Sequence, residues 1–229
     1  MPLLIYVSLM TGVILAEPYS KVIECSFVHS ADTPDRELYF RVGDYYHPIE
    51  FKKRERAGII SMQRMATFEV YEVVANRADE GDRYRLLASA QVPAHYQKVL
   101  LLVVEPNQEE GAKHRLIVID DSTKTFPGSA FLFVNLCRQI LKVNFGGASE
   151  DIGPDKVAVM PSEIGEKGGF VPCIIYNDKG QKYYENRLYS QQTARKIVFI
   201  GPPKLEGNLP VVSFLQQLLP HKLQPIPKQ

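Results

Sequence analysis

Short apolar runs alternate with turn-forming residues along most of the chain, and this pattern limits the fold more than any other feature of the sequence. Val22–Val28 alternates apolar and polar residues with the period of two that is typical of a half-buried strand. Lys98–Val104 is apolar after its first residue, which favours a central strand covered on both faces. Asn177-Asp178-Lys179-Gly180 is a strong turn signal. Helical periodicity is not sustained over three turns, so the pattern predicts an all-β sandwich or barrel.

The same alternation gives the expected strands. They cover residues 22–28, 38–42, 47–51, 59–62, 67–74, 84–92, 98–104, 115–119, 130–136, 140–145, 157–160, 170–176, 182–189 and 196–200. The segment 209–219 is ambiguous, because Val211-Val212 favours a strand whereas the residues that follow are compatible with a helical turn.

A polar stretch, Asp120–Ser129, separates two halves of similar character. The 229 residues fit one large β-domain or two small ones of about 100 residues each. We expect a first β-sandwich unit over residues 20–121 and a second over 126–219, followed by an extended proline-containing tail at 220–229. Each unit would hold about seven strands, the size of an immunoglobulin-like sandwich, although the Trp of antibody domains is absent.

The two halves also share local sequence. Leu38–Val42 with its following turn resembles Phe131–Asn135, and Lys98–Leu101 resembles Lys196–Phe199. These matches predict two tandem units that arose by internal duplication. The alternative is one large sandwich whose strands share their alternation by chance.

The N-terminus carries a candidate export signal. Leu3–Ala16 is uncharged and apolar, too short to span a bilayer, and is followed by Glu17-Pro18. We expect residues 1–16 to be a signal peptide, although no Lys or Arg precedes the apolar run; the alternative is a buried first strand. No later run is long enough for an integral membrane span. With the signal peptide removed, the expected location is therefore periplasmic or extracellular.

The charge balance and the motif content exclude several function classes. The formal net charge is +1, with 27 basic and 26 acidic side chains, so the sequence gives no electrostatic footprint for nucleic acid. Phosphate-cradling glycine loops, zinc-protease helices and serine-hydrolase elbows are all missing from the sequence. We expect no cofactor, no metal site, no catalytic residues and no enzymatic activity, and a partner that is another protein or an envelope polymer.

Three cysteines, Cys25, Cys137 and Cys173, are present without a CxxC pair. Cys25 alternates with apolar neighbours and is interpreted as a small buried hydrophobic residue. Cys137 and Cys173 lie in the same half and are a candidate disulfide in an oxidising compartment.

Charged clusters have a local interpretation. Asp120-Asp121 suggests a calcium site, but two adjacent acids on a strand point to opposite faces, so turn formation is favoured. The run Lys52–Arg56 is interpreted as a solvated turn or as a guard on a sheet edge. Tyr45 and Tyr46 beside a turn are candidates for ligand or partner contact, with ordinary strand aromatics as the alternative.

One resemblance is carried by short motifs, mainly in the second half. They are FPGSAFLFVN (126–135), Gly146-Gly147, Ile152–Pro154 and KIVFIGPP (196–203). Together they resemble a group of uncharacterised secreted bacterial all-β proteins with an F-P-x-G-S-x-x-F-x-N-like motif; here Pro127 and Gly128 are adjacent, with no residue between them. The resemblance implies secretion and a β-sandwich fold, and no activity.

Three hypotheses of function follow. The favoured one is an exported, non-enzymatic β-sandwich protein that is a binding or structural component of the cell envelope. The second is a carbohydrate-binding module that uses Tyr45 and Tyr46. The third is a hydrolase with a site between the two units.

Overall fold

The computed structural model describes residues 21–30, 36–51, 56–74, 84–105, 113–165, 167–202 and 211–218. Within these ranges the chain forms sixteen strands in four four-stranded sheets and no helix, which confirms the all-β expectation. The expected signal peptide, residues 1–16, and the tail at 220–229 lie outside the described residues.

The first unit holds eight strands in its described residues. They are β1 (Val22–His29), β2 (Leu38–Val42), β3 (Tyr45–Pro48), β4 (Ile60–Gln63), β5 (Thr67–Val73), β6 (Tyr84–Gln91), β7 (Lys98–Val104) and β8 (Arg115–Asp120). They form an inner sheet of order β4-β1-β7-β8 and an outer sheet of order β3-β2-β5-β6.

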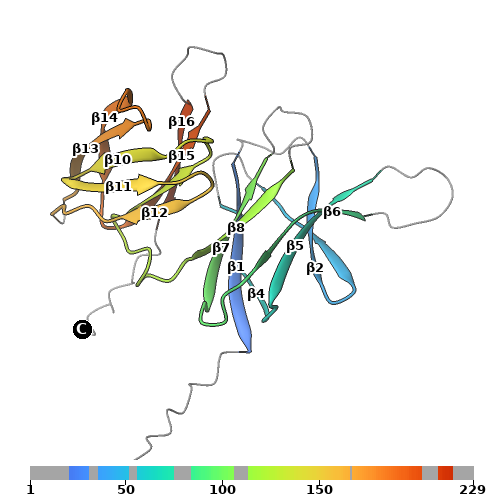
Figure 1. Cartoon of the computed structure of the whole chain (residues 1–229). Helices are drawn as coiled ribbons and strands as arrows, with labels where there is room; N and C mark the ends of the chain where they lie inside the picture. The colour runs from blue at the N-terminus through green and yellow to red at the C-terminus, as the bar shows by residue number, and fades with distance from the viewer. Residues whose placement is uncertain are drawn as a thin grey trace, which may run out of the picture.

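The second unit also holds eight strands in the part of the chain that is described. They are β9 (Phe131–Asn135), β10 (Leu141–Phe145), β11 (Ala148–Ile152), β12 (Val157–Met160), β13 (Gly169–Tyr176), β14 (Lys182–Ser190), β15 (Ala194–Gly201) and β16 (Val211–Leu218). The inner sheet has the order β12-β9-β15-β16 and the outer sheet β11-β10-β13-β14. Figure 1 shows the two units side by side.

The second unit repeats the strand order of the first, with every strand number raised by eight. In each inner sheet the first strand of the unit pairs in parallel with the seventh, β1 with β7 and β9 with β15. A two-residue turn containing a glycine with positive φ joins β2 to β3 at Gly43 and β10 to β11 at Gly146. The outer sheets also share a register shift, at Val70/Tyr71 and at Ile175/Tyr176.

These pairings correct the sequence match between the halves. β10 has the same position in the second unit as β2 has in the first, so Leu38–Val42 corresponds to 141–145 and not to Phe131–Asn135. The sequence match of Lys98–Leu101 with Lys196–Phe199 pairs the correct strands, β7 and β15, but aligns their residues one position out of register. Phe27 of β1 and Phe133 of β9 have equivalent positions in the two units. Phe27 pairs with Leu101 and Phe133 pairs with Val198, so Leu101 corresponds to Val198. A shift of one residue reverses the faces of a strand, and for this reason the core-facing residues were matched to the wrong positions.

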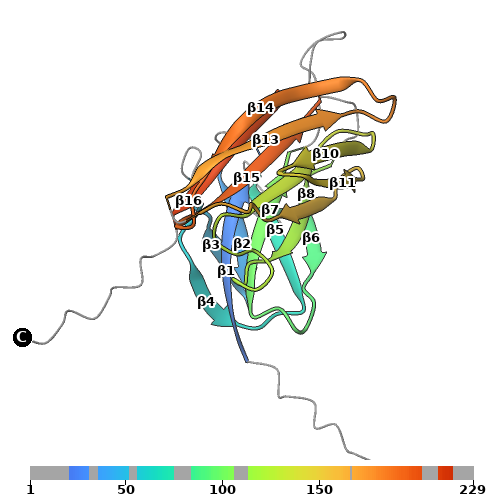
Figure 2. The ribbon, with the colours of Figure 1, turned by 90° about the vertical axis from the view of Figure 1, so that its left-hand side faces the viewer.

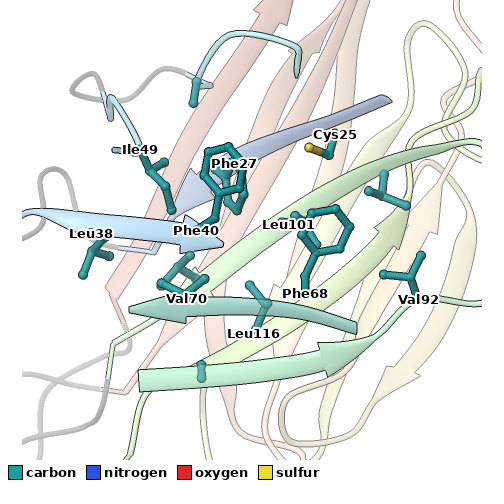
Figure 3. Close-up of a cluster of buried hydrophobic side chains, with 14 of the residues drawn as sticks. Cys25, Phe27, Leu38, Phe40, Ile49, Phe68, Val70, Val92, Leu101 and Leu116 are labelled. Carbon is teal, nitrogen blue, oxygen red and sulfur yellow. The ribbon is translucent and has the colours of Figure 1, made fainter. Parts of the chain in front are cut away.

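Three apolar cores lie between the four sheets. One fills the first sandwich around Phe27, Phe68 and Leu101, as Figure 3 shows, and another fills the second sandwich around Phe133 and its neighbours. A third core lies between the two inner sheets and joins the units; its buried members are Val28, Leu100, Leu102, Val104, Ile119, Phe126, Ala130, Leu132, Val134, Ile197, Phe199 and Leu215. The strands of the second unit cross those of the first obliquely (Figure 2).

This layered arrangement explains the long apolar run at Lys98–Val104. Val99, Leu101 and Val103 face the first core, whereas Leu100 and Leu102 face the core between the units. The prediction that this strand is covered on both faces is therefore confirmed.

Three strands differ from the expectation. β3 covers Tyr45–Pro48 instead of 47–51, so it begins directly after the two-residue turn. β11 was not predicted, because its sequence ASEDI is polar and its first four residues are exposed, as an edge strand permits. The ambiguous segment 209–219 forms a strand over Val211–Leu218. The immunoglobulin-like type stays a prediction.

A candidate binding groove and the junction between the units

An open groove of about 570 Å³ lies at the outer sheet of the second unit. It is lined by residues from β10, the position just before β10, β11, the end of β13 and the β13–β14 turn: Ile140, Lys142, Asn144, Asp151, Tyr176, Asn177, Asp178 and Gly180. Its volume is within the range of small-molecule sites.

Strand alternation places these side chains outward. Leu141, Val143 and Phe145 of β10 are buried in the core of the second sandwich, so Lys142 and Asn144 between them face the opposite side. Lys142 pairs with Asp151 of β11 on one side and with Tyr176 of β13 on the other. The groove therefore crosses three adjacent strands.

The β13–β14 turn that closes one end of the groove is held by Asn177. Its Oδ1 accepts hydrogen bonds from the backbone N–H of Lys179 at 3.0 Å and of Gln181 at 2.7 Å. Its Nδ2 donates to Gln181 Oε1 at 2.9 Å. These bonds form an Asx-type turn, in which Gly180 adopts a positive φ of 75°. The expected turn at Asn177–Gly180 is thus confirmed.

Asn144 adds an unsatisfied group to the groove. Its Oδ1 is buried and has no hydrogen-bond partner among the described residues. A buried acceptor without a partner costs free energy.

The equivalent face of the first unit is filled by aromatic rings. Tyr46 stacks on Tyr84 with centroids 3.8 Å apart and an interplanar angle of 7°, and meets Tyr71 edge-on at 5.0 Å. Tyr39 also packs edge-on against Tyr84, at 5.2 Å. We call Tyr39, Tyr46, Tyr71 and Tyr84 the tyrosine cluster.

The strand pairings locate each member of the tyrosine cluster in the second unit. Counting from the shared two-residue turns, Tyr39 corresponds to Lys142 and Tyr46 to Ser149. Counting from the shared register shifts, Tyr71 corresponds to Tyr176 and Tyr84 to Gly180. Three of the four tyrosine positions thus carry smaller or more flexible residues in the second unit, and the groove lies at this place.

Tyr45 and Tyr46 do not form one contact surface. They lie on strand β3, where adjacent side chains point to opposite faces of the sheet. Tyr46 packs within the tyrosine cluster, whereas Tyr45 is 75% exposed. Tyr45 and Tyr46 thus present different surroundings, and their role in ligand or partner contact stays a prediction.

The junction between the units contains a buried ionic network that was not predicted. Asp121 has no exposed surface, and its carboxylate pairs with Arg56 of the first unit and Arg195 of the second. Arg56 also donates to Gln217 Oε1 at 2.7 Å and to the hydroxyl of Ser26. The side chain of Arg56 is buried, so this end of the Lys52–Arg56 run is not solvated; residues 52–55 lie outside the described residues.

Arg195 ties the linker itself into this network. Its Nη1 donates to the Phe126 carbonyl oxygen at 2.8 Å, and its guanidinium lies 4.8 Å from the centre of the Phe126 ring. Burial lowers the pKa of Arg195; nearby Arg56 acts in the same direction, and Asp121 opposes both. Phe126 is buried in the core between the units, so the linker is part of the interface.

Asp120 behaves as predicted for a turn former. Its carboxylate accepts hydrogen bonds from the Ser122 backbone N–H at 3.0 Å and from the Thr125 hydroxyl. Burial alone would raise the pKa of Asp120, but these hydrogen bonds outweigh it and leave the pKa below its usual value. Asp120 and Asp121 therefore have separate roles, one in the turn and one in the ionic network.

A hydrolase site between the two units stays a prediction. The facing sheets are packed with apolar side chains there, and the groove lies at the outer sheet of the second unit. Among the described residues, no three His, Cys, Asp or Glu side chains are grouped so as to hold a metal ion. Within the same ranges, no helix has the length and apolar character that crossing a membrane would require.

The expected disulfide is not formed. Cys137 and Cys173, like Cys25, are free buried thiols, and both lie in the core of the second sandwich. Burial raises the pKa of Cys25 and Cys173 to about 12 and that of Cys137 to about 11. All three cysteines therefore act as small core residues, as was predicted for Cys25.

No protein-family model matches the chain, and no curated protein is significantly similar to it. The resemblance to the secreted bacterial all-β group thus stays a prediction.

Proposed function

We propose that the protein is an exported, non-enzymatic binding component of the cell envelope, and that its ligand occupies the groove of the second unit. The observation that carries the proposal is the groove itself. It combines an aromatic ring, an aliphatic side chain, a cation, two carboxylates and two amides in about 570 Å³. A concave site with a few convergent polar groups is the usual form of a ligand site.

The contrast between the two units supports the assignment. The same fold closes this face with the tyrosine cluster in the first unit and leaves it open in the second. The groove therefore depends on particular residues, chiefly Lys142 and Gly180 in its lining, with Ser149 where the first unit has Tyr46, and is not a consequence of the sandwich architecture.

We also infer that the two units arose by internal duplication. The shared strand order, the parallel first and seventh strands, the two-residue turns and the matched register shifts support this origin. Bulges are conserved within families, so a shift at the same place in both outer sheets is a specific argument. Superposing β1–β8 on β9–β16 in a crystal structure tests it; a fit that failed to bring Tyr71 onto Tyr176 would contradict it.

Binding is tested by co-sedimentation of the purified full chain with protein-free insoluble envelope polymer from the native host. The wild-type chain is expected to sediment, and the double variant Lys142→Tyr/Ser149→Tyr, which copies the tyrosines of the first unit, is expected to stay in solution. Tyr45→Ala, far from the groove, is the control and should sediment like the wild type. Equal sedimentation of all three chains, or of none, overturns the proposal.

Export is tested separately by N-terminal sequencing of the protein from the native host. A mature N-terminus just after Ala16 is expected. An intact Met1 in the soluble cytosolic fraction contradicts export.

A further inference from the structure

The outer face of the second unit continues beyond the groove as an apolar stripe. Along β13 the outward residues are Phe170, Pro172, Ile174 and Tyr176, which alternate with buried Val171, Cys173 and Ile175. At the far end, Phe170 is 61% exposed and meets the ring of Tyr189 at 5.3 Å. The stripe from Tyr176 to Phe170 is about 20 Å long at the rise of an antiparallel strand.

Polar side chains border the apolar stripe on both sides. Strand pairing places Asn144 beside Ile174 and Lys142 beside Tyr176 on the β10 side. On the β14 side it places Arg187 beside Pro172 and Glu185 beside Ile174. A ligand that lies along β13 thus meets apolar atoms underneath and hydrogen-bonding groups at its edges.

We propose that the ligand is a neutral polysaccharide chain, which lies in the groove and along the apolar stripe of β13. This inference rests on the function proposed above and names the ligand class of that same site. A sugar chain is amphipathic in the way that this face is: its rings present C–H faces to aromatic and aliphatic side chains, and its hydroxyls lie at the ring edges.

The groups in the groove match hydroxyls better than charges. Hydroxyls both donate and accept, and the groove is lined by carboxylates as acceptors, with Lys142 and side-chain amides as further polar groups. Asp151 and Asp178 outnumber the single cation Lys142 among the lining residues, so an anionic ligand would meet net repulsion. The length of the stripe favours a chain over a single sugar.

The experiment is affinity electrophoresis of the full chain in gels that contain soluble neutral polysaccharides (glucan, mannan, galactan or xylan) or, in a second arm, polymers of uronic acids. Retardation by at least one neutral polysaccharide is expected, with weaker or no retardation in the uronic acid gels. Isothermal titration with oligosaccharides of the retarding type then gives the affinity.

Variants connect the binding to the groove. Tyr176→Ala removes the aromatic platform and is expected to weaken binding about tenfold. Asn144→Ala removes a polar amide from the lining of the groove and is expected to weaken binding by roughly threefold to tenfold. Lys142→Tyr/Ser149→Tyr should abolish retardation while circular dichroism and the thermal midpoint show a folded chain. Tyr45→Ala is the control and should bind like the wild type.

The outcomes separate this inference from the proposed function. If the variant Lys142→Tyr/Ser149→Tyr binds neutral polysaccharide as well as the wild type does, sugar binding at this face is overturned. Two outcomes overturn the neutral-sugar ligand and leave the groove as a binding site. One is retardation by uronic acid polymers alone. The other is groove-dependent co-sedimentation with envelope polymer without binding to any soluble glycan. If the wild-type chain neither binds any glycan nor sediments with envelope polymer, both the ligand class and the proposed function are overturned.

Discussion

The carboxylate of Asp121 and the guanidinium of Arg195 form a buried ion pair between the two units, with Arg195 Nη1 3.2 Å from Asp121 Oδ1. Both side chains are almost fully removed from solvent, and Arg56 pairs with the other carboxylate oxygen. One carboxylate thus compensates two buried cations at the point where the linker leaves β8.

Replacing Asp121 by Asn is expected to lower the free energy of unfolding by about 3–5 kcal/mol, because two buried guanidinium groups lose their counter-charge. Asp120→Asn is the matched control, since the Asp120 carboxylate accepts hydrogen bonds from Ser122 and Thr125 of the adjacent turn; the expected loss for this variant is about 1 kcal/mol. Urea denaturation measures both. Similar losses for the two variants would mean that the network does not hold the units together.

Glu72 provides a pH-dependent contribution to stability. Burial by itself would raise the pKa of Glu72, but hydrogen bonds from Arg36 and Arg85 outweigh it and lower the pKa below its usual value. The ionised form is therefore favoured in the folded state. Its stabilisation is complete above the unfolded pKa of about 4.3 and is lost as the pH falls through the lower folded pKa.

The corresponding measurement is the free energy of unfolding of Glu72→Gln and wild type as a function of pH. The variant is expected to be less stable at neutral pH, and the difference should shrink on acidification below about pH 4. Glu150→Gln, on the exposed strand β11, is the control. A difference between wild type and Glu72→Gln that is constant across the whole range would show that the charge of Glu72 is not the cause.

The three thiols are expected to resist modification in the folded protein. Burial raises the pKa of Cys137 to about 11 and those of Cys25 and Cys173 to about 12, so almost no thiolate exists at pH 8. An aromatic disulfide reagent should label none of them within minutes in buffer and all three after unfolding in guanidinium. Rapid labelling of the native chain, or a mass lighter by the two hydrogens of a disulfide, would contradict the structure.

The two units are expected to unfold together. The core between the inner sheets holds large side chains of both units, including Leu102, Leu132 and Phe199, so neither unit loses its structure without exposing the face of the other. Calorimetry should show one transition. Leu102→Asp is expected to split it into two, whereas Leu86→Asp on the exposed part of β6 should not. Two transitions in the wild type would contradict this coupling.

Strands that bury apolar side chains could be predicted from the sequence, because alternation and apolar runs are local signals. Lys98–Val104 is the best example, since its continuous apolar sequence reports burial on both faces. β11 was missed for the opposite reason: it is an exposed edge strand, and its backbone pairing with β10 leaves no pattern in its side chains.

The candidate site was not visible in the sequence because it depends on pairings between distant segments. Lys142 and Asn144 could be assigned to the outward face of their strand, but nothing local shows that Tyr176 lies beside them. The role of Asp121 was missed in the same way, since Arg56 and Arg195 are far from it in the chain. Aligning the halves on the two glycine turns, at Gly43 and Gly146, would have revealed the substitution of tyrosines by smaller residues.

The parallel pairing of first and seventh strands has a consequence for how each unit forms. β1 joins β7 through pairs such as Cys25 with Val99, and β9 joins β15 through pairs such as Leu132 with Ile197. The centre of each inner sheet is therefore completed only after nearly the whole unit has been synthesised. Contacts of this sequence separation slow folding. Each unit is therefore expected to close its inner sheet in one late step, when its seventh strand inserts beside its first.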